Sequence, residues 1–135
     1  MKVKCIRTLI DNPPRSISES GWKDAGNSLT IGKLYTVFAI NHRGDCDWYL
    51  ICDDNYNDMG GYNYPVYIPA LFFLIKDHHK PGNWAVFPRD NCFEGPPELS
   101  FEYYEKIVEG DPSALSSFRK ELYKYQELES KEPLI

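Results

Sequence analysis

The chain has 135 residues, of which 42% are hydrophobic and 26% charged, and its formal net charge is −5. This length supports one hydrophobic core but not two ordinary domains, and the composition is that of a folded globular protein rather than a disordered chain. No apolar run approaches the roughly 20 residues that a membrane-spanning helix needs, which argues against a membrane protein.

The N-terminal residues carry positive charge, but no apolar segment follows them as it would in a secretory signal. We therefore expect a cytoplasmic protein. Its cysteines include no Cys-x-x-Cys pair, and their spacing matches no usual zinc pattern. We expect free thiols in a reducing compartment, with no cofactor and no bound metal. The four cysteines are Cys5, Cys46, Cys52 and Cys92.

The first two thirds of the chain predict short strands separated by turns. Residues 2–10 are rich in Val, Ile and Leu, which predicts a strand, and the prolines that follow end it. A loop rich in Ser, Gly and Asn then runs to residue 28. The next strand, 34–40, leads through a hairpin turn to 48–52, which is apolar on both faces and therefore central. Later strands are expected at 64–68, 71–75 and 84–87.

Residues 98–135 predict two helices. Gly110 is a natural stop for the first, and Asp111 and Pro112 suit the N-cap and first position of the second. Apolar residues recur at helical spacing in both segments. These positions are Leu99, Tyr103, Ile107 and Val108 in the first helix, and Leu115, Phe118, Leu122 and Tyr125 in the second.

Three segments resemble the small SH3-like barrels of bacterial and phage proteins. They are 29–37 (Leu-Thr-Ile-Gly-Lys-Leu-Tyr-Thr-Val), 48–54 (Trp-Tyr-Leu-Ile-Cys-Asp-Asp) and 64–72 (Tyr-Pro-Val-Tyr-Ile-Pro-Ala-Leu-Phe). The resemblance covers residues 29–77 and concerns strand and turn chemistry, so it bears on fold and not on function. The resemblance implies an SH3-like antiparallel β-barrel of about five strands, which we place at residues 1–97. Together with the two helices predicted above, it leads us to expect an α+β protein with a C-terminal two-helix hairpin, residues 98–135, packed on the barrel within one structural domain.

How the helices are used is open at this point. Their apolar faces can pack on the barrel, or they can form a homodimer surface. The oligomeric state, monomer or homodimer, therefore stays unresolved. The candidate dimer residues are Phe101, Tyr104, Tyr123 and Tyr125.

Acidic residues are unevenly distributed along the chain. Residues 1–97 carry ten basic and eleven acidic side chains, whereas residues 98–135 carry five basic and nine acidic ones. Residues 44–58 hold five aspartates and no Lys or Arg. Because phosphate binding requires clustered cations, we expect no nucleic-acid partner.

The aspartates of residues 44–58 are interleaved with aromatic side chains. Tyr and Trp often anchor protein interfaces, and carboxylates speed association with a basic partner. Because hairpin and loop residues of a barrel stand on one rim, they can form a joint surface. We therefore expect a non-catalytic protein-binding module, an immunity or inhibitor protein that neutralises a basic toxin or nuclease. The expected partner-binding residues are Asp45, Asp47, Trp48, Asp53, Asp54, Tyr56, Asp58, Tyr62 and Tyr64.

Other interpretations of these residues stay open. Turn aspartates can cap local backbone instead of binding a partner. Alternatively, Trp48, Tyr49 and the tyrosines near Asp53 can form an aromatic cage for a cationic group.

The runner-up function is a small metal-dependent hydrolase that uses Asp77-His78-His79, a string resembling one motif of the DHH phosphoesterases. A two-metal site needs several carboxylates and histidines around ions about 4 Å apart, and the further motifs of that family are missing from the sequence. The string is more simply a solvated turn before Pro81, so we predict no catalytic residue and no metal ligand.

Overall fold

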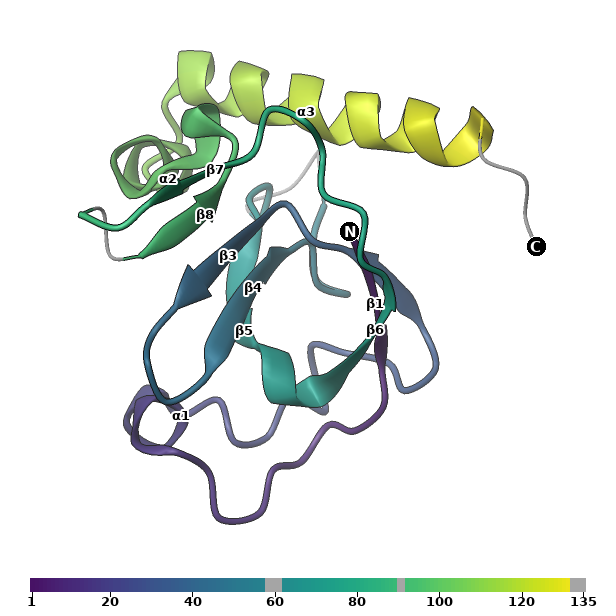
Figure 1. Cartoon of the computed structure of the whole chain (residues 1–135), viewed down its shortest axis with the longest axis vertical. Helices are drawn as coiled ribbons and strands as arrows, with labels where there is room; N and C mark the ends of the chain where they lie inside the picture. The colour runs from purple at the N-terminus through teal and green to yellow at the C-terminus, as the bar shows by residue number, and fades with distance from the viewer. Residues whose placement is uncertain (58–61, 90–91, 132–135) are drawn as a thin grey trace.

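The computed structural model describes residues 1–57, 62–89 and 92–131, apart from the side chains of Tyr123 and of residues 125–131. The fold is α+β, with strands up to residue 95 and two long helical segments after it (Figure 1). The strands are β1 (Lys2–Cys5), β2 (Leu34–Thr36), β3 (Ala39–His42), β4 (Asp47–Ile51), β5 (Val66–Pro69), β6 (Phe73–Asp77), β7 (Ala85–Phe87) and β8 (Phe93–Gly95). The helices are α1 (Arg15–Ser20), α2 (Phe101–Val108) and α3 (Pro112–Lys131), with 3-10 turns η1 (Ala70–Phe72) and η2 (Pro97–Leu99).

The strands form two antiparallel sheets. One has three strands in the order β2-β1-β6, and the other has five in the order β5-β4-β3-β8-β7. β4 lies between β5 and β3 and is buried along most of its length, which confirms the expected central strand. The three-stranded sheet pairs segments distant in sequence, since β1 contacts both β2 and β6.

One stretch of chain joins the two sheets. Residues 34–40 are predicted as a single strand, but the chain belongs to β2 up to Thr36 and to β3 from Ala39. Between them, the Val37 amide donates to the Met1 carbonyl (3.0 Å) and the Phe38 amide to the Leu50 carbonyl (2.8 Å). The backbone amides of Val37 and Phe38 are therefore both hydrogen-bonded, the first on the side of the three-stranded sheet and the second to the five-stranded sheet.

The expected closed barrel of about five strands is therefore only partly correct. The structure has two separate sheets with eight strands between them among the described residues. The predicted strand 84–87 exists as β7. Its partner β8 and helix α1 were not predicted from the sequence. β8 ends at Gly95, where a Cβ would lie 2.8 Å from the Ala39 Cβ, so this strand can approach β3 only with glycine at that position.

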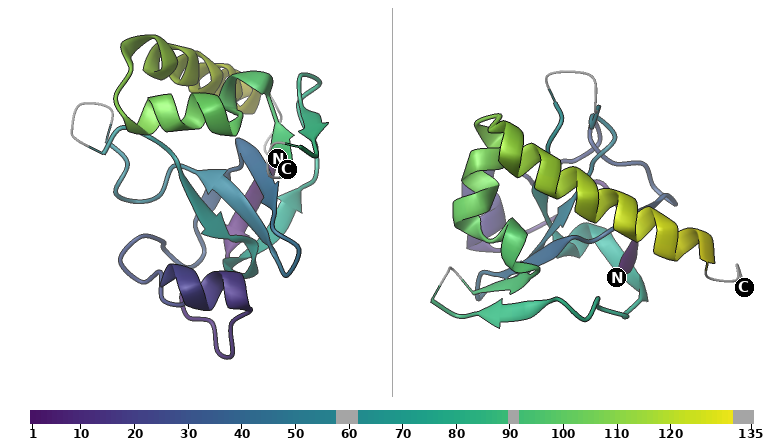
Figure 2. Two further views of the ribbon diagram at one scale, coloured as in Figure 1. Left: turned by 90° about the vertical axis from the view of Figure 1, so that its left-hand side faces the viewer. Right: turned by 90° about the horizontal axis from the view of Figure 1, so that it is seen from above.

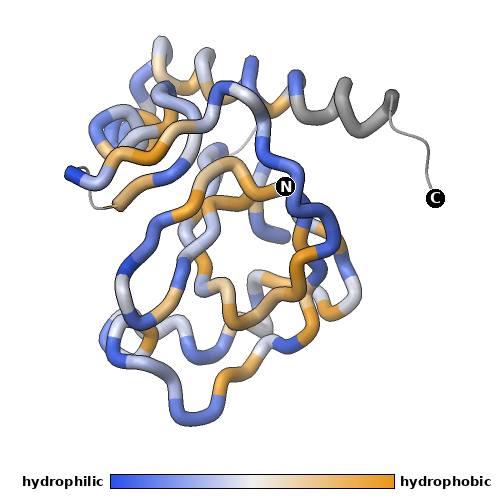
Figure 3. The backbone as a smooth tube through the Cα atoms, in the orientation of Figure 1, coloured by the Kyte–Doolittle hydropathy of each residue, from blue (hydrophilic) through white to orange (hydrophobic). Residues whose placement is uncertain are grey.

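The main core lies between the two sheets. Val3 and Cys5 of β1 face inward, and so do Ile51 of β4 and Ile68 of β5, all fully buried. Figure 3 shows in orange that the chain segments that meet there are rich in hydrophobic residues. β1 alternates buried and half-buried residues, as a strand with one covered face should.

The ends of α2 and α3 follow the predicted chemistry. At Gly110 the backbone takes a left-handed φ of 85°. The Gly110 amide donates to Ile107 and the Asp111 amide to Lys106, which is the Schellman pattern at a helix C-terminus. Asp111 Oδ2 then accepts a hydrogen bond from the Ala114 amide (2.9 Å), as an N-cap of α3 does. Both the glycine stop and the aspartate cap are confirmed.

The apolar faces of the helices pack on the sheets, as the first of the two expected arrangements has it. Phe118 of α3 is fully buried with its ring edge-on to Phe38 (centroids 5.5 Å), and Ile107 of α2 is also fully buried. α3 crosses the body, and its second half projects past the sheets (Figures 1 and 2). Two expected apolar positions, Tyr103 and Val108, are exposed instead. No helix in the described part of the chain is long and apolar enough to cross a membrane.

Candidate functional site

Asp45, in the turn between β3 and β4, binds the start of α1. Its two carboxylate oxygens accept hydrogen bonds from Ser16, one from the hydroxyl (2.6 Å) and one from the backbone amide (2.8 Å). These bonds lower the pKa of Asp45. α1 lacks a side-chain cap of its own, so an aspartate distant in sequence supplies one.

Asp47 belongs to a charged cluster beside that turn. The Nδ1 atom of His42 lies 2.8 Å from Asp47 Oδ1, and Nε2 lies 2.9 Å from Glu94 Oε1. Lys80 binds the other oxygen of Glu94 (2.7 Å). Burial opposes protonation of His42, but the hydrogen bonds to the two carboxylates outweigh it, and the pKa of His42 is raised. The cluster bridges β3, β4 and β8.

Trp48 is part of the core and not of an exposed rim. Only 1% of its surface is accessible, and the Arg43 guanidinium lies over its ring. Tyr49 is also buried, and it points to the opposite side of β4 because side chains alternate along a strand. The structure therefore places neither residue in an exposed aromatic cage.

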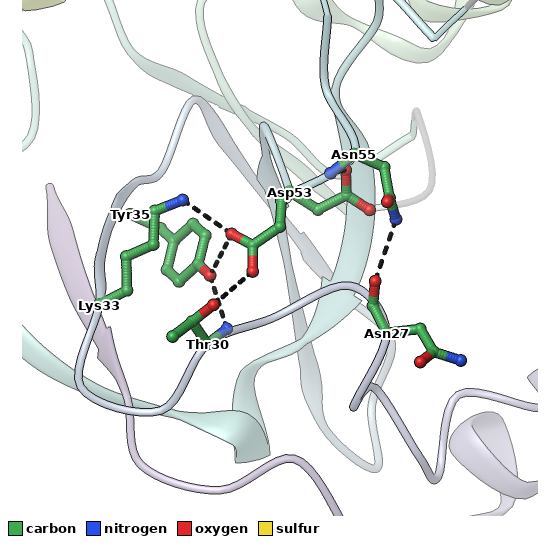
Figure 4. Close-up of polar contacts among 7 residues, drawn as sticks. Asn27, Thr30, Lys33, Tyr35, Asp53 and Asn55 are labelled. Atoms are coloured by element: carbon green, nitrogen blue, oxygen red, sulfur yellow. Dashed lines mark hydrogen bonds and ion pairs between the residues drawn. The ribbon is translucent and has the colours of Figure 1, made fainter.

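Asp54 lies beyond the other end of β4 and binds three side chains. These are Thr30, Lys33 and Tyr35, which lie together in Figure 4. Its Oδ1 accepts from Lys33 Nζ (2.7 Å) and the Tyr35 hydroxyl (2.8 Å), and Oδ2 accepts from the Thr30 hydroxyl (2.6 Å). Burial alone would raise the pKa of Asp54, but these bonds lower it. Asp54 thus ties the loop before β2 to the end of β4.

Asp53 is buried, with 6% of its surface accessible. Oδ1 accepts a hydrogen bond from the Asn55 amide (3.1 Å) in a tight turn, and burial raises the pKa of the carboxyl group. The second oxygen, Oδ2, has no hydrogen-bond partner among the described residues. This carboxylate is not available to a partner at the surface.

The acidic segment does not form one rim, and that expectation was wrong. β4 separates Asp45 and Asp47 from Asp53 and Asp54, and its five residues span roughly 15 Å at about 3.3 Å each. All four aspartates contact groups of the chain itself. Asp58 lies outside the described residues.

The predicted tyrosines divide between core and surface. Tyr56 is half-buried, edge-on to Phe118 (centroids 6.3 Å). Tyr62 is 40% exposed and stacks on Tyr64 with ring centroids 5.1 Å apart. The pair lies near Tyr104 of α2, which contacts Pro65, the residue after Tyr64. Burial raises the pKa of Tyr104 to about 12, and the Tyr64 and Tyr62 hydroxyls add to this shift. The Tyr104 hydroxyl donates to the carbonyl of Pro65 (3.1 Å).

An acidic face, which the sequence reasoning missed, lies on another side of α2 than Tyr104. Glu102, Glu105 and Glu109 are exposed, and their spacing of three and four places them on one side of α2. No ion pair engages them among the described residues. Their spacing is visible in the sequence and could have identified them. We call these glutamates together with Tyr62 and Tyr64 the α2 surface.

A surface of different chemistry covers the outside of the three-stranded sheet. Lys4 of β1 pairs with Leu34 on one side and with Leu74 on the other. The two leucines are 50% and 52% exposed. The row formed by Leu34, Lys4 and Leu74 is apolar and basic. Its three strands are distant in sequence from the acidic helix α2.

Asp77-His78-His79 forms a turn, as its simpler interpretation predicted. Asp77 ends β6, and its Oδ1 accepts a hydrogen bond from the His79 amide (2.9 Å). Both histidines are exposed. Within residues 1–57, 62–89 and 92–131, no three His, Cys, Asp or Glu side chains are grouped so that they could hold a metal ion.

Comparison of the chain with protein-family models, with curated proteins and with solved structures found no match. The function must therefore be inferred from the residues of this chain alone.

Proposed function

We propose that this chain is a non-catalytic protein-binding module with an SH3-like body, an immunity or inhibitor protein for a basic toxin or nuclease. The α2 surface is the binding site in this proposal. The observation that carries it is that α2 presents three exposed glutamates, which make no ion pair among the described residues. Tyr104 of the same helix lies near the stacked pair of Tyr62, which is exposed, and Tyr64, which is half-buried.

The strand order supports an SH3-like body. In such a body one long strand is shared by two small sheets, as β2 and β3 are here. A 3-10 turn, η1, separates β5 from β6, and β6 returns to pair with β1. β7, β8 and the helices are then additions to this body, and α2 presents the proposed binding surface.

The chemistry of the α2 surface suits a basic protein partner. Tyr62 and Tyr64 offer rigid rings that can be buried with little loss of side-chain entropy. The glutamates provide a negative potential that steers a cationic surface and rejects an acidic one. Covering the cationic cleft of a toxin would block its access to an anionic substrate, and this requires no catalytic group in the inhibitor.

The proposal is tested by reversing charge on α2. Glu102→Lys/Glu109→Lys should slow association with the captured partner about tenfold or more at low salt, because steering depends on the local field. The partner is first captured from a lysate of the source cells and identified by mass spectrometry. Association rates are then measured by surface plasmon resonance at two salt concentrations.

A matched control separates local charge from net charge. Asp11→Lys/Glu19→Lys makes the same change in net charge on exposed residues of another region, and it should leave the rate within about twofold. A second control, Leu34→Ser/Leu74→Ser, removes the apolar row of the three-stranded sheet. Binding that survives the α2 reversal but is lost in this second control would overturn the proposal.

A further inference from the structure

An open pocket of about 600 Å³ lies where the end of β3, the start of β8 and the start of α2 meet. Its volume is within the range of small-molecule sites. It shares no residue with the α2 surface, and Phe101, which precedes Glu102 on α2, is its one contribution from that helix. The lining residues are Asn41, His42, Arg43, Gly44, Cys92 and Phe101.

Arg43 is held in a fixed orientation at this pocket. Its Nε donates to Asn41 Oδ1 (2.6 Å), and its guanidinium carbon lies 3.9 Å from the centroid of the Trp48 ring. Asn41 and Trp48 are both buried, so the two groups that orient the guanidinium are themselves fixed. A planar fork oriented in this way loses little side-chain entropy when it binds a ligand.

Within the described residues, no partner is found for the terminal nitrogens of Arg43. The Arg43 side chain makes one hydrogen bond there, through Nε, and no ion pair. The nearby carboxylate of Asp45 is engaged by Ser16. Burial lowers the pKa of Arg43, as expected for a cation that has lost water without gaining a close counter-ion.

The rest of the pocket favours an apolar ligand body. Phe101 presents a ring that is itself stacked on Tyr67 (centroids 5.6 Å, planes 5° apart). Cys92 contributes a thiol to the pocket wall. Gly44 has no side chain, so its backbone forms part of the wall. Two acidic groups, Asp47 and Glu94, lie behind the pocket on His42 and disfavour a doubly charged anion.

We propose that this pocket binds a small aromatic carboxylate, with its carboxylate on the terminal nitrogens of Arg43 and its ring against Phe101. A planar carboxylate accepts two parallel hydrogen bonds from one guanidinium. A phosphate dianion usually draws on several cationic donors, and this pocket offers one arginine. The ligand class is therefore a monoanion of modest size.

The test is an NMR titration of the ¹⁵N-labelled full chain with benzoate, at ionic strength matched with sodium chloride. Benzoate should shift the Arg43 Nε–H and Cys92 amide signals with a Kd of about 1 mM, typical for so small a ligand. Benzamide, which has the same shape without charge, should bind at least tenfold more weakly, and so should phenyl phosphate. Equal binding of benzamide, or preference for phenyl phosphate, would overturn the assignment.

Substitutions locate the site. Arg43→Gln should abolish the shifts, and Arg43→Lys, which keeps the charge but loses the fork, should weaken binding at least fivefold. Arg7→Gln makes the same charge change at an exposed arginine elsewhere and should leave Kd unchanged. Retained affinity in a folded Arg43→Gln variant would refute the role of the guanidinium.

A measurement on the unmodified protein guards against variants that fail to fold. Cys92 is the exposed cysteine of the pocket, whereas Cys46 is half-buried outside it. Saturating benzoate should slow alkylation of Cys92 by iodoacetamide at least fivefold and leave Cys46 unchanged, as followed by peptide mass spectrometry. An unchanged rate of Cys92 alkylation would show that benzoate does not occupy the pocket. The role of Arg43 would then be limited to covering the Trp48 ring.

Discussion

At the scale of single residues, the aspartates of the acidic segment act inside the fold. Asp54 is the clearest case, because it joins Thr30, Lys33 and Tyr35 through its two oxygens. Sequence composition predicted a charged, aromatic segment. It could not show which of its carboxylates are hydrogen-bonded to other residues of the chain. The partners of Asp45 and Asp54 lie about twenty or more residues away, and no local pattern reports such contacts.

Replacing Asp54 should therefore cost stability. Asp54→Asn keeps the shape but removes the charge and one acceptor, so we expect the free energy of unfolding to fall by about 1–3 kcal/mol. Asp11→Asn, at an exposed position, should change it by less than about 0.5 kcal/mol. Urea denaturation followed by circular dichroism measures both. Equal stability of the two variants would mean that the Asp54 contacts are solvent-screened.

His42 makes stability depend on pH. Its pKa is raised in the folded state, so its contribution is fully present below the unfolded pKa of about 6.5 and is lost as pH rises through the folded pKa. Glu94 has a lowered pKa, and its contribution is lost on the acid side, below about 4.5. The cluster is therefore most stabilising between these two limits.

The predicted result is a pH-dependent difference between the protein and His42→Gln. The free energy of unfolding of the native protein should exceed that of the variant most at about pH 5.5–6, and this difference should shrink by pH 8. Urea titrations across that range measure it. A difference independent of pH would show that His42 acts only by packing and neutral hydrogen bonds.

At the scale of elements, the C-terminal helices were predictable and the small elements were not. Gly110 and Asp111 act locally, so their roles can be read from neighbouring residues. α1 depends on a distant cap, Asp45, and β8 depends on how closely Gly95 approaches Ala39. The break between β2 and β3 has no local signal, because strand-forming residues run continuously through it.

α3 should be an integral part of the fold rather than an appendage. Phe118 is fully buried against Phe38 and Tyr56, so Phe118→Ala should reduce the free energy of unfolding by about 3–5 kcal/mol. Lys120→Ala, on an exposed position of the same helix, provides the control and should have little effect. A comparable loss in both variants would mean that burial of Phe118 is not what makes α3 stabilising, since alanine favours the helix at both positions.

At the scale of the whole molecule, the exposed chemistry is divided between different faces. The glutamates of α2 lie on the helical addition, whereas Lys4 with Leu34 and Leu74 lies on the three-stranded sheet. The net charge of −5 is therefore not uniformly spread. A basic partner should be oriented toward α2 during encounter, which is why the charge-reversal experiment measures association rate and not affinity alone.

The pairing of β1 with β6 has a consequence for how the chain folds. Val3 pairs with Ile75, whereas β3, β4 and β5 pair with their neighbours along the chain. Contacts between distant segments carry the larger loop-closure cost, so the β3–β5 meander can form before the three-stranded sheet closes. β1 is synthesised well before β6, and its apolar side chains must remain uncovered until β6 has emerged. The interval between the two is the period when this protein is most exposed to misassociation.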